Sequence, residues 1–145
     1  MKAKLEEINS IAGVRGSFIY INDGEIIFHA LPPGFDNDTC NEIAKDVVQM
    51  AAISDRLQTG ITEYDMKFDG GRIFAYAQHN YNIIIVCDLS VSMAMLRLTV
   101  NVAIADLEAD KKIQKRLSKV ENSRRSFLVR SNMDNDSWHL VETVN

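Results

Sequence analysis

Hydrophobic and polar positions change their period several times along the chain, and each change predicts a new element. Residues 2–12 repeat apolar side chains at three- and four-residue spacing, which predicts a short amphipathic helix. Residues 14–21 and 25–31 are rich in β-branched and aromatic side chains, and an Asn-Asp-Gly turn sequence separates them. These two segments predict a β-hairpin.

A long helix is predicted next, over residues 41–60. Thr39 and Glu42 have the spacing of a capping box, so we expect Thr39 to cap this helix. The helical pattern runs to about Thr59, and Gly60 is placed to end the helix in the left-handed conformation.

Three strands and a second long helix follow. Residues 61–68 alternate between apolar and charged side chains, which predicts an edge strand with one buried face. Residues 72–78 form the next strand, and the unbroken apolar run in residues 83–88 is typical of a central strand. A helix begins near Ser92, and its apolar periodicity weakens past Asp110.

The predicted element order is α-β-β-α-β-β-β-α, an α+β sandwich built on one five-stranded antiparallel sheet. We expect the two terminal helices to share one face of the sheet, with the middle helix on the other face. Residues 1–119 form the predicted domain. Residues 120–145 lose the periodicity and are interpreted as a C-terminal tail that is flexible or docks on a partner.

The middle helix is apolar over too much of its circumference for a helix that packs on a single surface. At about 100° per residue its apolar side chains cover roughly 220°, whereas one packing stripe needs little more than about 100°. A second copy would cover the other flank, with the two middle helices side by side and the strand 61–68 at the shared edge. The residues predicted for this dimer interface are Ile43, Val47, Met50, Ala51, Leu57, Tyr64 and Met66.

Several short motifs occur in a distinctive order. They are Ile11-Ala12-Gly13-Val14-x-Gly16 at the first strand, Asp23-Gly24 in the hairpin, Gly60 after the middle helix, Gly70-Gly71 in the next turn, and Leu96-Arg97 in the last helix. In this order the chain resembles the Roadblock/dynein light chain family, close to the longin and profilin-like folds, over roughly residues 4–117. The chain departs from the family at residues 92–95, where the family often has a glycine.

The resemblance implies a dimer that is not itself an enzyme. It also implies that the dimer binds a Ras-like small GTPase, whose nucleotide cycle it modulates or localises, or that it acts as a scaffold. On the middle helix, Ile53 projects among polar residues, and we interpret a patch of Asp46, Gln49, Ile53 and Arg56 as a candidate partner-binding surface.

Composition and charge narrow the choice of partners. The chain has 145 residues, 46% of them hydrophobic, and lacks a secretory signal, so we expect one cytoplasmic domain with reduced cysteines. Residues 111–130 hold eight Lys and Arg against one Glu, a net +7 that leaves −11 for the rest of a chain of net charge −4. The basic segment suits a helix end, an acidic partner or weak contact with an anionic membrane surface; nucleic acid is not expected.

Catalytic constellations are missing from the sequence. It contains no P-loop, HExxH, GxSxG or metal-ligand spacing, so we expect no cofactor, no metal and no catalytic residue. Four arginines are candidates for stabilising phosphoryl transfer by residue type alone: Arg15, Arg56, Arg72 and Arg97. The alternative interpretation is a small-molecule sensor of the PAS or GAF kind, which would need an internal pocket with convergent polar groups.

Overall fold

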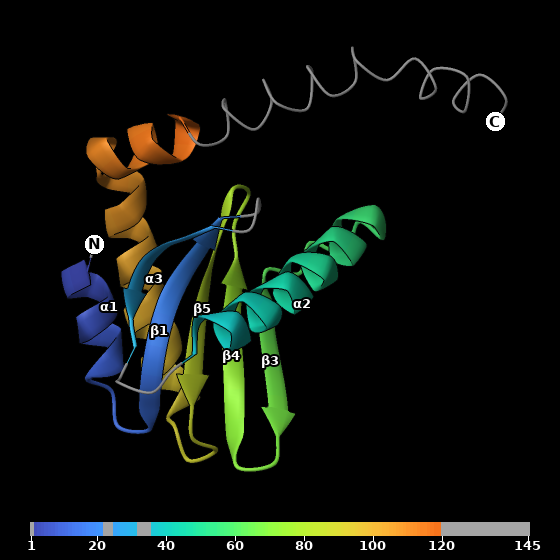
Figure 1. Ribbon diagram of the computed structural model, residues 1–145, viewed down its shortest axis with the longest axis vertical. Coiled ribbons are helices and arrows are strands. Elements are labelled where there is room, and N and C mark those ends of the chain that lie inside the picture. The colour runs from blue at the N-terminus through green and yellow to red at the C-terminus, as the bar shows by residue number, and fades with distance from the viewer. Residues whose placement is uncertain (1, 22–24, 32–35, 120–145) are drawn as a thin grey trace, which may run out of the picture. The chain divides into compact units, whose positions relative to one another are not determined.

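A five-stranded antiparallel sheet in the order β2-β1-β5-β4-β3 lies at the centre of the fold (Figure 1). The computed structural model describes residues 2–21, 25–31 and 36–119. β5 is buried at all seven of its positions, so the apolar run did predict a central strand. The strands are β1 (Val14–Ile21), β2 (Ile26–Ala30), β3 (Glu63–Phe68), β4 (Gly71–Ala77) and β5 (Tyr81–Cys87).

Helices cover both faces of this sheet. α1 (Lys2–Asn9) and α3 (Met93–Ala109) lie on one face, and α2 (Asn37–Arg56) lies on the other (Figure 1). The predicted fold class and the predicted distribution of the helices are therefore confirmed.

Strand alternation divides the core into two layers. On the α2 side, Phe18 of β1 is paired with Ile84 of β5, and Ile84 with Ala75 of β4. These side chains form one buried cluster with three α2 residues, listed here: Cys40, Ala44 and Val47. The other layer belongs to α1 and α3, and its fully buried side chains include Leu5, Ile8, Ile19, Ile85, Leu96 and Val100.

The limits of α2 correct two details of the sequence prediction. The N-cap is Asp36, whose carboxylate accepts a hydrogen bond of 2.8 Å from the Asp38 amide, so the predicted capping box at Thr39 is wrong. The helix ends at Arg56, three residues before the predicted limit. Gln58 adopts a positive φ of 55° and Gly60 a φ of 68°, so the chain turns over several residues instead of stopping at one glycine.

Gly13 joins the start of β1 to the segment between β5 and α3. Its φ is +95°, and a Cβ built there would lie 3.1 Å from the Val91 Cα. Its carbonyl also accepts a hydrogen bond of 2.7 Å from the Asp88 amide. Both the left-handed conformation and the close approach require glycine, which gives the motif at residues 11–16 a physical reason.

The chain divides into two units, Met1–Asp110 and Lys111–Asn145. Within the second unit residues 111–119 are helical. Residues 120–145 lie outside the described part of the chain, so the domain boundary expected at residue 119 and the tail stay predictions.

Replacing the observed cap tests the start of α2. We expect Asp36→Ala to lower the free energy of unfolding by about 1 kcal/mol, because one orphan amide of the first turn loses its acceptor. The matched variant Thr39→Ala should change it by less than about 0.5 kcal/mol. Urea denaturation of both variants measures the difference, and a larger loss for Thr39→Ala would restore the capping box.

Cys40 and Cys87 are free and buried, as the sequence predicted. Burial raises the pKa of Cys87 to about 11, and burial first and Asp36 second raise the pKa of Cys40. Because the thiolate is the reactive form, we expect neither thiol to react with an aromatic disulfide reagent at pH 8 in the folded protein, and both to react in denaturant. Fast reaction of either thiol without denaturant would contradict this burial.

Candidate interaction surface on α2 and β3

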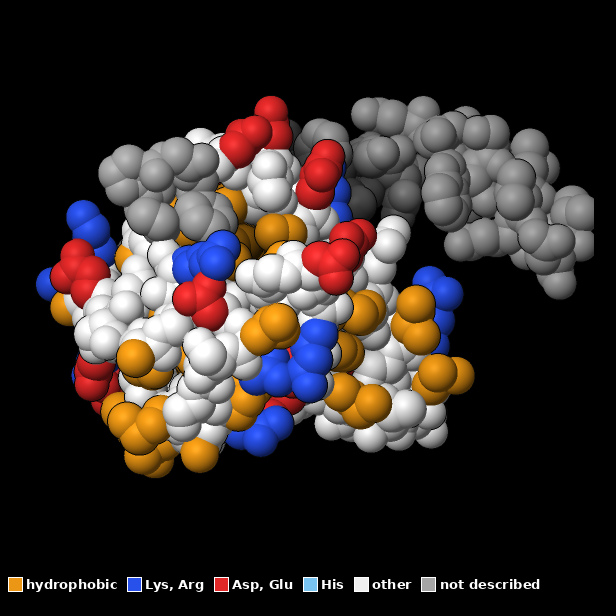
Figure 2. Space-filling view, turned by 90° about the horizontal axis from the view of Figure 1, so that it is seen from below, with side chains coloured by type: hydrophobic (Ala, Val, Ile, Leu, Met, Phe, Trp, Pro, Cys, Tyr) orange, Lys and Arg blue, Asp and Glu red, His pale blue; other side chains and the backbone are white. Residues whose placement is uncertain are grey.

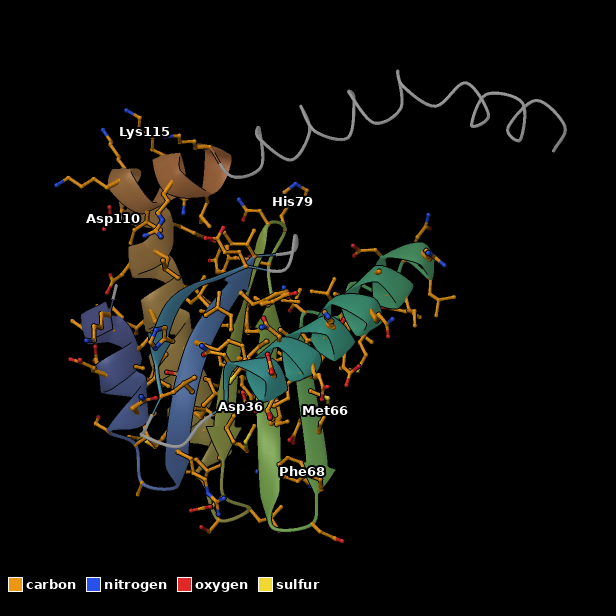
Figure 3. The ribbon with its side chains drawn as sticks, in the orientation of Figure 1. Asp36, Met66, Phe68, His79, Asp110 and Lys115 are labelled. Carbon is orange, nitrogen blue, oxygen red and sulfur yellow. The ribbon has the colours of Figure 1, made fainter. Side chains whose placement is uncertain are left out.

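The C-terminal part of α2 extends past the β3 edge of the sheet (Figure 1). Large hydrophobic side chains are exposed on this part and on the adjoining strand: Ile53 is 54% exposed, Leu57 69%, Ile61 51% and Phe68 47%. Ile53, Leu57 and Ile61 lie around the end of α2, whereas Phe68 lies at the other end of β3 (Figure 3). Single exposed apolar side chains are ordinary, but several on neighbouring elements are typical of an interaction surface. We call these four residues the α2–β3 surface.

Ser54 fixes this surface in place. It is the innermost polar residue of α2, only 6% exposed. Its hydroxyl shares a hydrogen bond with the Thr59 hydroxyl and lies 3.4 Å from the Ile61 carbonyl oxygen. Tyr64 donates its hydroxyl to the same Ile61 carbonyl at 3.3 Å. The end of α2 is therefore held against the start of β3, which presents Leu57 and Ile61 in a defined position.

β3 is an edge strand, as the sequence predicted. It pairs with β4 on one side, and the strand order leaves its other edge without a neighbouring strand among the described residues. Tyr64, Met66 and Phe68 lie opposite Ala75, Ile73 and Gly71 of β4, on the face that carries α2. Met66 and Phe68 follow one another along this strand (Figure 3).

The residues predicted for the dimer interface fall into three groups. Val47 is fully buried within the single chain and belongs to its core. Leu57 is exposed, at 69%. The remaining five are partly buried: Ile43, Met50, Ala51, Tyr64 and Met66. All of these except Ala51 pack against the core cluster. The interface itself stays a prediction.

The four residues predicted to bind a partner are all exposed on α2. Asp46, Gln49, Ile53 and Arg56 follow at spacings of three and four, so they share one side of the helix. Ile53 also belongs to the α2–β3 surface, so the predicted polar patch and the exposed apolar group are continuous. Binding at this patch stays a prediction.

The other candidate arginines are held by acids in the same chain. Arg15 contacts Asp88 at 2.5 Å, Arg97 contacts Glu63 at 3.0 Å, and Arg72 lies 3.0 Å from Asp65. Arg72 is also nearly buried, at 9% exposure. For Arg56 the described residues offer no acid within ion-pair distance. Arg56 is therefore the arginine of this set that is exposed and forms no ion pair with another described residue.

The described residues contain no group of three or more His, Cys, Asp or Glu side chains placed to hold a metal ion, and no helix long and apolar enough to cross a membrane. An open groove of about 400 Å³ lies at the opposite edge of the sheet, beside α1 and β2. Its lining residues are Lys2, Glu6, Asn9, Arg15, His29, Ala30 and Leu31.

Sequence reasoning did not include Ile61 and Phe68 in the surface. Phe68 shares the alternating face of Tyr64 and Met66, so that pattern could have found it. Ile61 could not be found in this way, because its exposure depends on how the segment after α2 turns.

Sequence comparison matches this chain to no protein-family model and to no curated protein. Structure comparison finds clear likenesses. A Roadblock/LC7 domain from Streptomyces avermitilis has a TM-score of 0.64 at 10% identity, over 75% of this chain and 95% of that one. MglB from Myxococcus xanthus has a TM-score of 0.66 at 16% identity, over 80% and 88%. A structure described as MglB with tetrameric arrangement has a TM-score of 0.63 at 17% identity, over 79% and 88%.

These likenesses agree with the resemblance to the Roadblock family that the sequence motifs suggested. At such low identities they establish the architecture and leave the activity open. The chain has the Roadblock/LC7 fold.

Proposed function

We propose that this protein is a non-enzymatic homodimer that binds a Ras-like small GTPase and modulates or localises its nucleotide cycle in the cytoplasm. The observation that carries the proposal is the α2–β3 surface, an exposed apolar group beside an unpaired sheet edge. A two-fold axis at this edge would place two copies of α2 side by side and continue the sheet through β3.

The geometry supports a dimer at this edge in two ways. Leu57 and Ile61 belong to a segment that Ser54 ties to the end of α2 through hydrogen bonds, which would reduce the conformational freedom lost on binding. The edge of β3 carries alternating charges, Glu63, Asp65 and Lys67, on the side away from α2, which leaves the α2 side apolar. Pairing of two β3 strands would bury the backbone groups of both edges together.

The GTPase is proposed as the partner from the Roadblock/LC7 fold together with the exposed side of α2. In the proposed dimer the two sides bearing Asp46, Gln49 and Arg56 would form one continuous platform. Because Arg56 has no acid within ion-pair distance among the described residues, it is the arginine we propose to contact the partner's anionic groups. Residues 1–119 are the proposed domain, and residues 120–145 a tail outside it.

A small-molecule sensor is not favoured. Sheet positions facing α2 are filled by the apolar cluster around Phe18 and Ile84. The groove described above is open and lies beside α1 instead of between helix and sheet.

Substitution at the exposed end of α2 tests the dimer. We expect light scattering of the native chain to give a self-associated mass, at least twice 16.3 kDa. Leu57→Asp should lower that mass while the circular dichroism spectrum stays native, because Leu57 is 69% exposed in the single chain.

Two controls separate dissociation from unfolding. Leu89→Asp alters a similarly exposed leucine elsewhere, 53% exposed, and should keep the native mass. Val47→Asp places a charge in the core of the single chain and should unfold it. An unchanged mass for Leu57→Asp would remove this end of α2 from the interface.

Binding of the GTPase is a separate test. Ras-like GTPases from the same organism, each loaded with GDP or a GTP analogue, should include one that the native protein retains on a column. Asp46→Ala and Arg56→Ala should each weaken binding of the GTPase by about 1–2 kcal/mol, or roughly tenfold in affinity, without changing the oligomeric mass. Retention of none of these GTPases in either nucleotide state would refute the proposed partner.

A further inference from the structure

α3 carries a second apolar stripe on its solvent side. Its buried stripe, which contains Leu96, Val100 and Leu107, faces the sheet. On the opposite side Met95 is 53% exposed, Leu98 63% and Val102 46%. A helix that is apolar on both sides is normally covered on both sides.

The spacing of the exposed residues indicates which kind of element packs on this side of α3. Met95, Leu98, Val102, Ala105 and Ala109 repeat at intervals of three and four, and all five are exposed. This is the a-d-a-d-a order of a coiled-coil seam, whose partner is another helix crossing at about 20°. We call these five residues the α3 seam.

We propose that the α3 seam binds the α3 seam of a second copy of this chain, in an antiparallel helix pair. The two-fold axis would cross the seam at the level of residue 100, between Leu98 and Val102. It would bring the a positions of one helix opposite the d positions of the other. Leu98 then meets Val102 of the second copy, and Met95 meets Ala105. A large side chain faces a smaller one in each layer, so the two surfaces interdigitate.

Charge along the seam agrees with self-association. In an antiparallel pair, the flanking Thr99 lies next to Thr99 of the second copy, and Asn101 next to Asn101. A charged residue at either position would repel its own copy. Both residues are neutral and can form hydrogen bonds across the axis.

The charged residues near the seam do not oppose this pairing. Arg97 is bound to Glu63 at 3.0 Å, and Asp106 to Lys4 at 2.8 Å, so each is already neutralised within the chain. Glu108 would face Ala94 of the second copy, not another acid.

The helix α3 lies on the opposite face of the sheet from α2 (Figure 1), so a contact through its solvent side is separate from the α2–β3 dimer. In the view from below, hydrophobic side chains likewise reach the surface in more than one group, with charged side chains between the groups (Figure 2). Both contacts can form at once. Because α3 is already folded on the sheet, no helix has to form on binding, even though the seam has only five positions.

Mass measurements on variants of the full chain test the proposal. Leu98→Asp and Val102→Asp should each lower the native mass by one association step, a factor of two, while the circular dichroism spectrum stays native. Leu89→Asp, with a leucine of similar exposure outside the seam, is the matched control and should keep the native mass.

The α2–β3 and α3 contacts are distinguished by combining variants. If both exist, Leu57→Asp and Leu98→Asp each halve the mass, and the double variant is a monomer. If only the α3 contact exists, Leu57→Asp has no effect and Leu98→Asp gives the monomer. A mass that falls with Leu57→Asp but not with Leu98→Asp overturns the α3 proposal and leaves the α2–β3 dimer standing.

Cross-linking gives a direct second measurement. Asn101→Cys places a thiol beside the two-fold axis, and Cys40 and Cys87 are buried, so oxidation should produce a disulfide-linked dimer through residue 101 alone. Glu6→Cys on α1 is the control and should remain mostly unlinked. Equal linkage in the two variants, or none in Asn101→Cys, overturns the proposal and indicates that the tail or a different protein covers the seam.

Discussion

Packing of α2 on the β1-β5-β4 part of the sheet is the contact on which the interaction surface depends. The α2 residues that face the sheet are small or medium-sized, Cys40, Ala44 and Val47, so the helix approaches closely. A single helix cannot cover five strands, and this one crosses the sheet and continues beyond β3 (Figure 1). The apolar residues that remain exposed on its end and on the edge strand are a direct result of this crossing.

The two faces of the sheet offer surfaces of different character. The α2 side combines exposed leucine and isoleucine with acids and an accessible arginine, which suits a partner that is recognised by shape and charge. The α3 seam carries no charge in its five positions and is flanked by neutral side chains. It suits a symmetric contact between identical helices, where each residue meets a copy of itself or of a near neighbour.

Charge pairing within the chain explains why the candidate arginines are not equivalent. Arg15, Arg72 and Arg97 tie strand ends or α3 to neighbouring elements through carboxylates at 2.5–3.0 Å. Arg97 in particular joins α3 to β3 around the edge of the sheet, where it stabilises the framework. Arg56 belongs to the part of α2 that has left the sheet, and its accessibility follows from the same geometry that exposes Leu57.

Periodicity alone determined the order of the elements, the central place of β5 and the edge position of β3, because these depend on which side chains alternate or repeat. It also showed that α2 is apolar over a wide arc. Only the tertiary structure decided that Val47 belongs to the chain's own core while Leu57 is exposed. Both lie within that apolar arc, but Val47 packs on the sheet and Leu57 lies where α2 has passed β3. The N-cap of α2 is Asp36, whose carboxylate accepts a hydrogen bond from the Asp38 amide, a contact that the spacing of Thr39 and Glu42 did not reveal. The outer stripe of α3 became visible only when the structure showed which of its two apolar sides faces the sheet.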